Sequence, residues 1–207
     1  MIDIAEQITA IDRRVAQRSS DSGATVVVTV NRRYPARIDD VWTALTDPER
    51  VRGWFLPLSG DLTEGGSYQL EGNSSGDILI CRRPGQLVIT FGGPRSVVDL
   101  RLSQDGRETV LELEHTVPVE MAGSSAGALY VGPGWDSALN SLSNYLAGEV
   151  SDDPVAAASS PEAQDFCAQS VDAWAAVVTA SGTSDAEAIA SARKVALEQF
   201  APDVKHH

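Results

Sequence analysis

The sequence is poor in the residues on which metal and redox sites depend. Its 207 residues include two cysteines, Cys81 and Cys167, and three histidines, of which His206 and His207 close the chain as native residues or as the remnant of a purification tag. Two distant cysteines provide neither a disulfide framework nor a metal-ligand spacing. We therefore expect both cysteines to be small core residues and the chain to use no metal or other cofactor.

Positive charge and long apolar runs are also scarce. Sixteen Lys and Arg stand against 29 Asp and Glu, giving a net charge of −13. This balance opposes binding to nucleic acid and to anionic membrane surfaces. No window approaches the roughly eighteen consecutive apolar residues of a membrane span. We expect a soluble cytoplasmic protein with no nucleic-acid or membrane partner.

No nucleophile beside a base is evident in the sequence. Nucleophilic catalysis needs a base next to a serine or cysteine, and His115 is the one internal histidine, with no evident partner. The glycine-rich GGSYQLEGNSSG stretch leads into a strand pattern and not into a helix with a lysine, so it indicates a hairpin rather than a phosphate loop. These residue types favour a protein that is not an enzyme, and an enzyme is the alternative.

The chain does carry strong secondary-structure patterns at its start. Ile4, Ile8, Ile11 and Val15 share one helical face, which predicts an amphipathic N-terminal helix over residues 1–23. The β-branched stretch 24–34 then predicts a strand.

Two short helices are expected next. An apolar stripe and Asp39 or Asp40 as N-cap predict the first, while Asp47 followed by Pro48 predicts the cap of the second. The stretch that follows, WFLPL from Trp54, puts large apolar side chains on a loop, where something must cover them or they must line something.

Five short alternating runs separated by turn residues predict an antiparallel meander. They cover residues 68–71, 77–81, 86–91, 96–102 and 109–115. The runs 77–81 and 86–91 are apolar on both faces, so we expect a cover over part of the outer surface, either the chain's own tail or a second subunit in a homodimer.

Helices dominate the remainder. Apolar residues from Trp135 to Leu146 recur at helical spacing, and Gly148 follows as a stop. Residues 151–160 are typical of a linker. The tail, 161–207, predicts a helical hairpin capped at Ser160 and Ser184. Its expected buried residues are Phe166, Cys167, Val171, Trp174 and Val178, then Ile189, Val195 and Phe200.

Four motifs resemble a known superfamily. They are YPARIDDVWTALTDPERVRGWFLPLSGDL, GGSYQLEGNSSGDI, LELEH and GWDSALNSLSNYLAG. These are similar to the SRPBCC superfamily of START-like and birch-pollen-allergen-like helix-grip domains, and within it to homologues of the activator of heat-shock-protein ATPase. The resemblance covers about residues 24–148, and the SVDAWAAVVTASGTSDAEA run looks like the extension of bacterial, especially actinobacterial, members.

The resemblance implies an α+β helix-grip fold: a curved antiparallel sheet wrapped around a long C-terminal helix, with two short helices after the first strand. The helix-grip ligand-binding domain would span 24–150. The runs that are apolar on both faces further predict that the hairpin of 161–207 packs on this domain. A cavity between sheet and helix would have Trp54 and Phe55 at its mouth and Trp135 and Leu139 on its helical wall. The implied sheet side consists of Leu70, Ile78 or Leu79, Ile89, Phe91, Leu100, Leu113 and, by its parity in the last run, His115.

Three functions fit these expectations. The first is binding of a small apolar or amphipathic ligand in the cavity. The second is a cyclase or dehydratase acting on a hydrophobic substrate, for which His115 is the one inward polar group. The third is a co-chaperone-like protein-binding role, which rests on the family label alone. A lone inward histidine is more often structural than catalytic.

Overall fold

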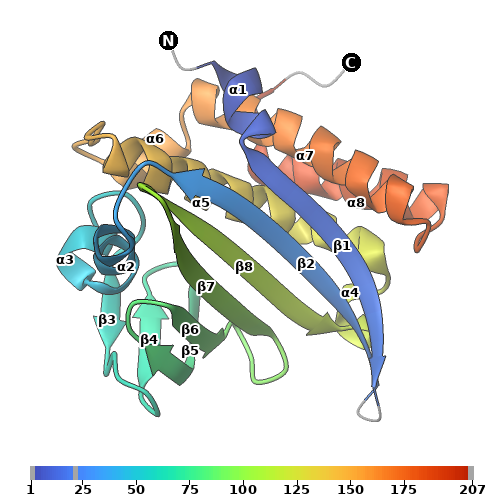
Figure 1. The fold of residues 1–207 in the computed structure, drawn as a ribbon. Coiled ribbons are helices and arrows are strands. Elements are labelled where there is room, and N and C mark those ends of the chain that lie inside the picture. Colours follow the sequence, from blue (N-terminus) through green and yellow to red (C-terminus); the bar gives the residue numbers. More distant parts are fainter. Residues whose placement is uncertain (1–2, 21–22, 205–207) are drawn as a thin grey trace. The chain divides into compact units, whose positions relative to one another are not determined.

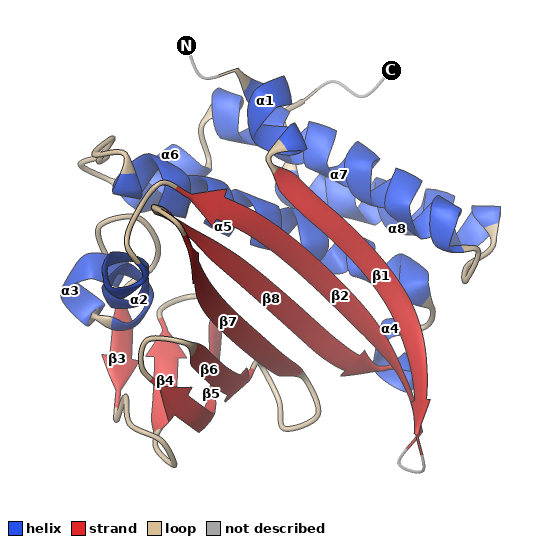
Figure 2. Cartoon of the chain, in the orientation of Figure 1, coloured by secondary structure: helices blue, strands red, loops and turns tan. Residues whose placement is uncertain are grey.

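A computed structural model describes residues 3–20 and 23–204 (Figures 1 and 2). The strands are β1 (Ile11–Ser20), β2 (Gly23–Tyr34), β3 (Leu58–Gly60), β4 (Ser67–Leu70), β5 (Ser74–Arg82), β6 (Gln86–Thr90), β7 (Val97–Asp105) and β8 (Glu108–Pro118). The helices are α1 (Ile4–Thr9), α2 (Ile38–Thr46), α3 (Pro48–Val51), α4 (Val119–Ala122), the 3-10 helix η1 (Ser125–Tyr130), α5 (Gly132–Leu146), α6 (Pro154–Ala158), α7 (Pro161–Ser181) and α8 (Ala186–Phe200).

The strands form one eight-stranded sheet in the order β1-β2-β8-β7-β6-β5-β4-β3. This sheet, the two short helices after β2 and the long α5 confirm the predicted α+β helix-grip class. Within the described residues, no helix combines the length and the apolarity that crossing a membrane requires.

The chain divides into two compact units. Unit 1 comprises the chain up to Val30, Thr116–Leu139 and the chain from Ala156 onward, whereas unit 2 comprises Asn31–His115 and Asn140–Val155. The division therefore falls inside β2, β8, α5 and α6, and the last of these points lies within the expected linker 151–160. That linker itself contains the short helix α6.

The tail helices supply much of the core of unit 1. Ser160 caps α7 through its hydroxyl, and Gly182 ends the helix with a left-handed φ of 67°. All five residues expected to be buried along α7 are buried, with Val171, Trp174 and Val178 at 0% exposure. Three details of α8 were predicted wrongly. Asp185 is its N-cap instead of Ser184, Val195 is 44% exposed, and Phe200 is only half-buried.

The predicted N-terminal helix is wrong beyond Thr9, because β1 occupies Ile11–Ser20. The spacing of four between Ile11 and Val15 suits a helix face, but residues four apart also share one face of a strand. Arg13 lies on the same strand face as these two residues, and its side chain is only 6% exposed. A charged residue on the buried face interrupts the alternation of apolar and polar residues that would indicate a strand.

A buried ion pair explains the inward arginine. The Nε of Arg13 donates to Oδ2 of Asp136 on α5 at 2.7 Å, and Ser170 Oγ and Trp174 Nε1 on α7 donate to the same oxygen. Burial raises the pKa of Asp136, while Arg13, Ser170 and Trp174 act in the opposite direction. The ion pair thus links β1, α5 and α7 within unit 1.

The strand register of unit 2 separates two faces of its sheet. Ile78 lies opposite Ile89, which lies opposite Val98, whereas Val88 lies opposite Asp99. A register shift between Ile78 and Ile80 breaks the alternation in β5. As a result Ile78 is buried on the inner face, and Leu79 is 46% exposed.

The outer face of this sheet carries polar groups as well as apolar ones. Gln86 donates to Asp99, and Arg101 pairs with the same carboxylate, so polar groups occupy that face next to Val88. The tail hairpin belongs to unit 1 and strands β5 and β6 belong to unit 2, so the role of the hairpin as their cover stays a prediction. Cys167 is buried as expected, but Cys81 is only half-buried.

The two short helices are confirmed. Asp47 caps α3 by accepting the amide of Glu49 at 2.9 Å. The expected cap of α2 is wrong, because Arg37 is the N-cap residue and makes no side-chain cap bond. Asp39 and Asp40 lie in the first helical turn, where a carboxylate favourably meets the positive end of the helix dipole.

Candidate ligand-binding site

The inner face of the sheet in unit 2 is mostly apolar but unevenly buried. Leu100 and Leu113 are 8% and 3% exposed, as core residues should be. Leu70, Ile89 and Phe91 are only half-buried, although two of them lie within strands of the same sheet. A close-packed core covers its apolar side chains, so these three residues are the better candidates for lining a ligand site.

An aromatic pair follows α3 in the same unit. The rings of Trp54 and Phe55 are stacked with centroids 5.3 Å apart, and both residues are half-buried. The indole Nε1 of Trp54 donates to the carbonyl of Ala44 on α2 at 2.9 Å. The WFLPL loop therefore presents a positioned aromatic surface that remains partly open to solvent.

His115 is inward, as its parity in β8 predicted, and it is 2% exposed. Its Nε2 shares a 2.8 Å hydrogen bond with Ser96 Oγ, and its ring meets the edge of Phe91 with centroids 5.6 Å apart. Burial lowers the pKa of His115 to about 4. The imidazole is therefore neutral at pH 7, which suits a structural residue better than a proton-transfer catalyst.

Trp135 and Leu139 lie on the part of α5 that belongs to unit 1. Leu139 is 3% exposed, and Trp135 is half-buried. The other eight predicted ligand residues all belong to unit 2. The structure thus gathers those eight in one unit, and a cavity shared with the helical wall stays a prediction.

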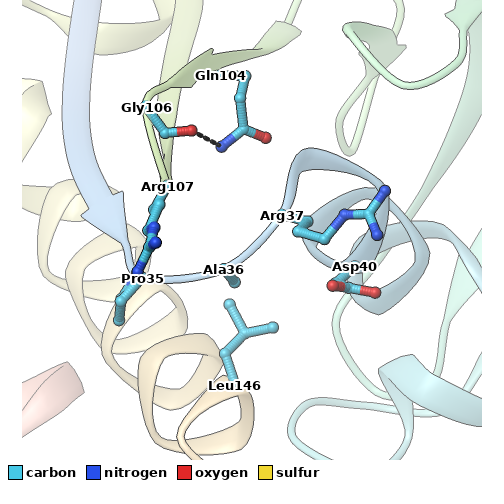
Figure 3. A pocket seen from close by; sticks show the side chains of 8 residues that line it. All are labelled: Pro35, Ala36, Arg37, Asp40, Gln104, Gly106, Arg107 and Leu146. Atoms are coloured by element: carbon cyan, nitrogen blue, oxygen red, sulfur yellow. Dashed lines mark hydrogen bonds between the residues drawn. The ribbon is translucent and has the colours of Figure 1, made fainter.

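The sequence reasoning missed an open cleft in unit 2 (Figure 3). Its volume is about 810 Å³. The lining residues are Pro35, Ala36, Arg37, Asp40, Gln104, Gly106, Arg107 and Leu146. Gly106 and Arg107 belong to the turn between β7 and β8, where the residues Gln104-Asp105-Gly106 indicate only a turn between two strands. A pairing of this turn with residues 35–40 could not be found from local patterns, because it depends on the sheet order.

The family is decided by a match to its sequence model. The model described as Activator of Hsp90 ATPase homolog 1-like protein, AHSA1, matches residues 35–147. The chain belongs to this family. The motif resemblance is confirmed, and the AHSA1 match covers the short helices, the meander and α5.

Solved structures agree with the AHSA1 assignment. The crystal structure of CalU16 from Micromonospora echinospora is 38% identical, with a TM-score of 0.67, and the match covers 82% of this chain and 99% of that one. Its solution structure gives 39% identity, a TM-score of 0.69 and coverages of 83% and 97%. Since these matches extend past residue 147, they include part of the chain beyond the AHSA1 region.

Two more distant matches add context. DynU16, a protein of the dynemicin biosynthetic locus, is 26% identical with a TM-score of 0.53, and the match covers 58% of this chain and 47% of that one. An AHSA1-like protein from Rhizobium etli is 23% identical with a TM-score of 0.52, and the match covers 63% of this chain and 88% of that one. This match supports the fold alone. A search of curated proteins found no match.

Proposed function

We propose that this AHSA1-family chain binds a small apolar or amphipathic molecule against the inner sheet face of unit 2, with Trp54 and Phe55 at the mouth of the site. The observation that carries the proposal is the incomplete burial of these two residues together with Leu70, Ile89 and Phe91. Apolar surface that the chain itself does not cover gains free energy when a ligand removes it from water.

The neutral state of His115 supports binding over catalysis. A buried imidazole with a pKa of about 4 adds no charge to the inner face at pH 7, so it does not oppose an apolar ligand. DynU16 is described as a protein in the dynemicin biosynthetic locus. The similarity to DynU16 is consistent with this proposal, because biosynthetic pathways handle small organic molecules.

The test is calorimetric titration of the full chain with 1-octanol and naphthalene, after a native mass spectrum of the purified protein to detect any retained ligand. Trp54→Ala should weaken binding by about 1 to 3 kcal/mol, since it removes a large aromatic contact. Leu79→Ala is the matched control, because Leu79 is a 46% exposed apolar residue away from the inner face. Unchanged affinity in Trp54→Ala, or loss of the folded state, would contradict the proposed mouth.

His115→Gln separates binding from catalysis. Glutamine keeps a hydrogen-bonding group for Ser96 but does not titrate, so we expect ligand affinity within about tenfold of the parent, equivalent to about 1.4 kcal/mol. Conversion of a bound molecule by the parent protein, with loss of that turnover in His115→Gln, would instead support an enzyme.

A further inference from the structure

The cleft lined by Arg37 and Arg107 lies entirely within unit 2 and shares no lining residue with the proposed apolar site. Figure 3 shows Arg107 and Arg37 on separate segments, with Leu146 between these segments in the view. At about 810 Å³, the cleft is within the usual size range of small-molecule sites.

The two arginines set this cleft apart from the rest of an acidic surface. Arg33, close by in sequence, is paired with Asp105 at 2.7 Å and with Glu108 at 3.5 Å. Arg37 and Arg107, in contrast, make no ion pair or side-chain hydrogen bond to any residue that the structure describes. Asp40 is the one carboxylate in the lining. In a chain of net charge −13, this cleft holds an excess of positive charge.

Neutral hydrogen bonds hold the walls of the cleft in place. Gln104 accepts the amide of Ile38 at 2.8 Å and donates to the carbonyl of Glu108 at 2.7 Å. Thr109, which is fully buried, donates to the carbonyl of Ala36 at 2.8 Å. The α2 entrance and the β7–β8 turn are therefore fixed to each other without use of either guanidinium.

The remaining lining is apolar. Pro35, Ala36 and Leu146 contribute side chains without charge, and Leu146 is half-buried. A ligand that suits this lining has an oxyanion for the guanidiniums and a short apolar body. Guanidinium groups favour planar carboxylates and phosphates because two N–H groups can bind two oxygens together.

We propose that this cleft is a second binding site, specific for a small amphipathic oxyanion, a carboxylate or a phosphate monoester. Arg37 and Arg107 bind the anionic group, and Pro35 and Leu146 contact the apolar body. Asp40 limits the affinity through its repulsion of the anion. This site goes beyond the apolar ligand site and does not depend on it.

The experiment is calorimetric titration of the full chain with octanoate, octyl phosphate, 1-octanol and octylammonium. We expect one or both anions to bind in the cleft, with affinity that falls as salt is raised, and octylammonium not to bind there. The stronger of octanoate and octyl phosphate identifies the preferred head group. Equal affinity for octanoate, octyl phosphate and 1-octanol would overturn the proposal.

Matched variants locate the site. Arg37→Gln and Arg107→Gln should each weaken anion binding by at least about fivefold, since each removes a charge-assisted hydrogen-bond donor. Arg82→Gln removes the same charge from an exposed arginine outside the cleft and should leave the affinity unchanged. Asp40→Asn should tighten binding. An equal loss in Arg82→Gln would show a general charge effect and overturn the site.

Trp54→Ala distinguishes this proposal from the apolar site. Octanoate or octyl phosphate bound in the cleft should be insensitive to Trp54→Ala, and 1-octanol bound on the inner face should be insensitive to Arg37→Gln and Arg107→Gln. Anion binding that depends on Trp54 and not on the two arginines would refute the cleft and leave the apolar site standing.

Discussion

Each unit buries an ionisable side chain, and the two units accommodate it differently. In unit 1, Asp136 is 0% exposed and is held by Arg13 together with Ser170 and Trp174. In unit 2, His115 is 2% exposed and contacts the neutral Ser96 hydroxyl and the Phe91 ring. Burial penalises the charged form of both groups. In unit 1 the positive charge of Arg13 offsets this penalty for Asp136, whereas in unit 2 His115 stays neutral.

The difference assigns different tasks to the two centres. The Asp136 centre links three elements of unit 1, so its removal should cost stability. Oδ1 of Asp136 and Nη2 of Arg13 are buried and have no hydrogen-bond partner among residues 3–20 and 23–204, so even this pair is incompletely satisfied. The His115 centre adds no charge of its own to the inner sheet face of unit 2 at pH 7, although the buried Arg32 of β2 lies in the same unit.

The largest effect should come from breaking the charged centre. Asp136→Leu leaves Arg13 buried without a counter-charge and removes the acceptor of Ser170 and Trp174, so we expect a loss of about 3 to 5 kcal/mol in the free energy of unfolding. Urea denaturation measures it. Asp165→Leu, at an exposed position of α7, is the control and should change stability by less than about 0.5 kcal/mol.

A paired substitution sharpens this result. Arg13→Met combined with Asp136→Leu removes both charges and should recover a large part of the lost stability, because an uncompensated buried charge is then absent. If Asp136→Leu alone were no more destabilising than the pair, the ion pair would not be the reason for its cost.

The neutral centre should appear in the pH dependence of stability. The folded-state pKa of His115, about 4, is below its ordinary value of 6.5, so the unfolded chain binds the proton more tightly. The contribution of this pKa difference to the free energy of unfolding is fully present above pH 6.5. About 3 kcal/mol of it is lost as the pH falls toward 4. The stability difference between the parent and His115→Gln, measured by urea denaturation from pH 7 to pH 4, should show this loss. A difference that does not vary with pH would mean that the folded protein protonates His115 readily.

A smaller effect tests the packing around the charged centre. A Cβ added at Gly132 would lie 2.4 Å from Trp174 Cε2, so Gly132→Ala should push the indole away from Asp136 and cost about 1 to 3 kcal/mol. At Gly134, in the same helix, the nearest atom would be Phe200 Cε1 at 3.4 Å. Thermal unfolding should show Gly134→Ala to be nearly neutral. Equal effects at the two positions would contradict the close approach of Gly132 to Trp174.

Much of the fold could be predicted from local patterns. The meander, the two short helices, α5 and the buried face of α7 each follow from a clear period and clear turn or cap residues. The missed strand β1 had an ambiguous period and a charged residue on its buried face. The tiny strand β3, at Leu58–Gly60, lies in the loop that the WFLPL stretch had marked as unusual.

The candidate sites were less predictable. Parity placed His115 and Leu113 inward, but it could not distinguish a fully buried Leu100 from a half-buried Ile89, because exposure depends on what packs above each residue. In β5, apolar residues on both faces left Ile78 and Leu79 equivalent. The register shift after Ile78 decides between them, and it arises from pairing with β6.

By itself, the sequence determined the family, the fold class and the inward histidine, since these rest on motifs and periods that are local in the chain. Only the tertiary structure decided the partner of Asp136, which is 123 residues away at Arg13. It also brought residues 35–40 to the β7–β8 turn to form the cleft. Both results depend on contacts between segments that are distant in the sequence. Burial and charge in the folded protein set the free energy of such contacts, and no regular spacing of residues in the sequence reveals them.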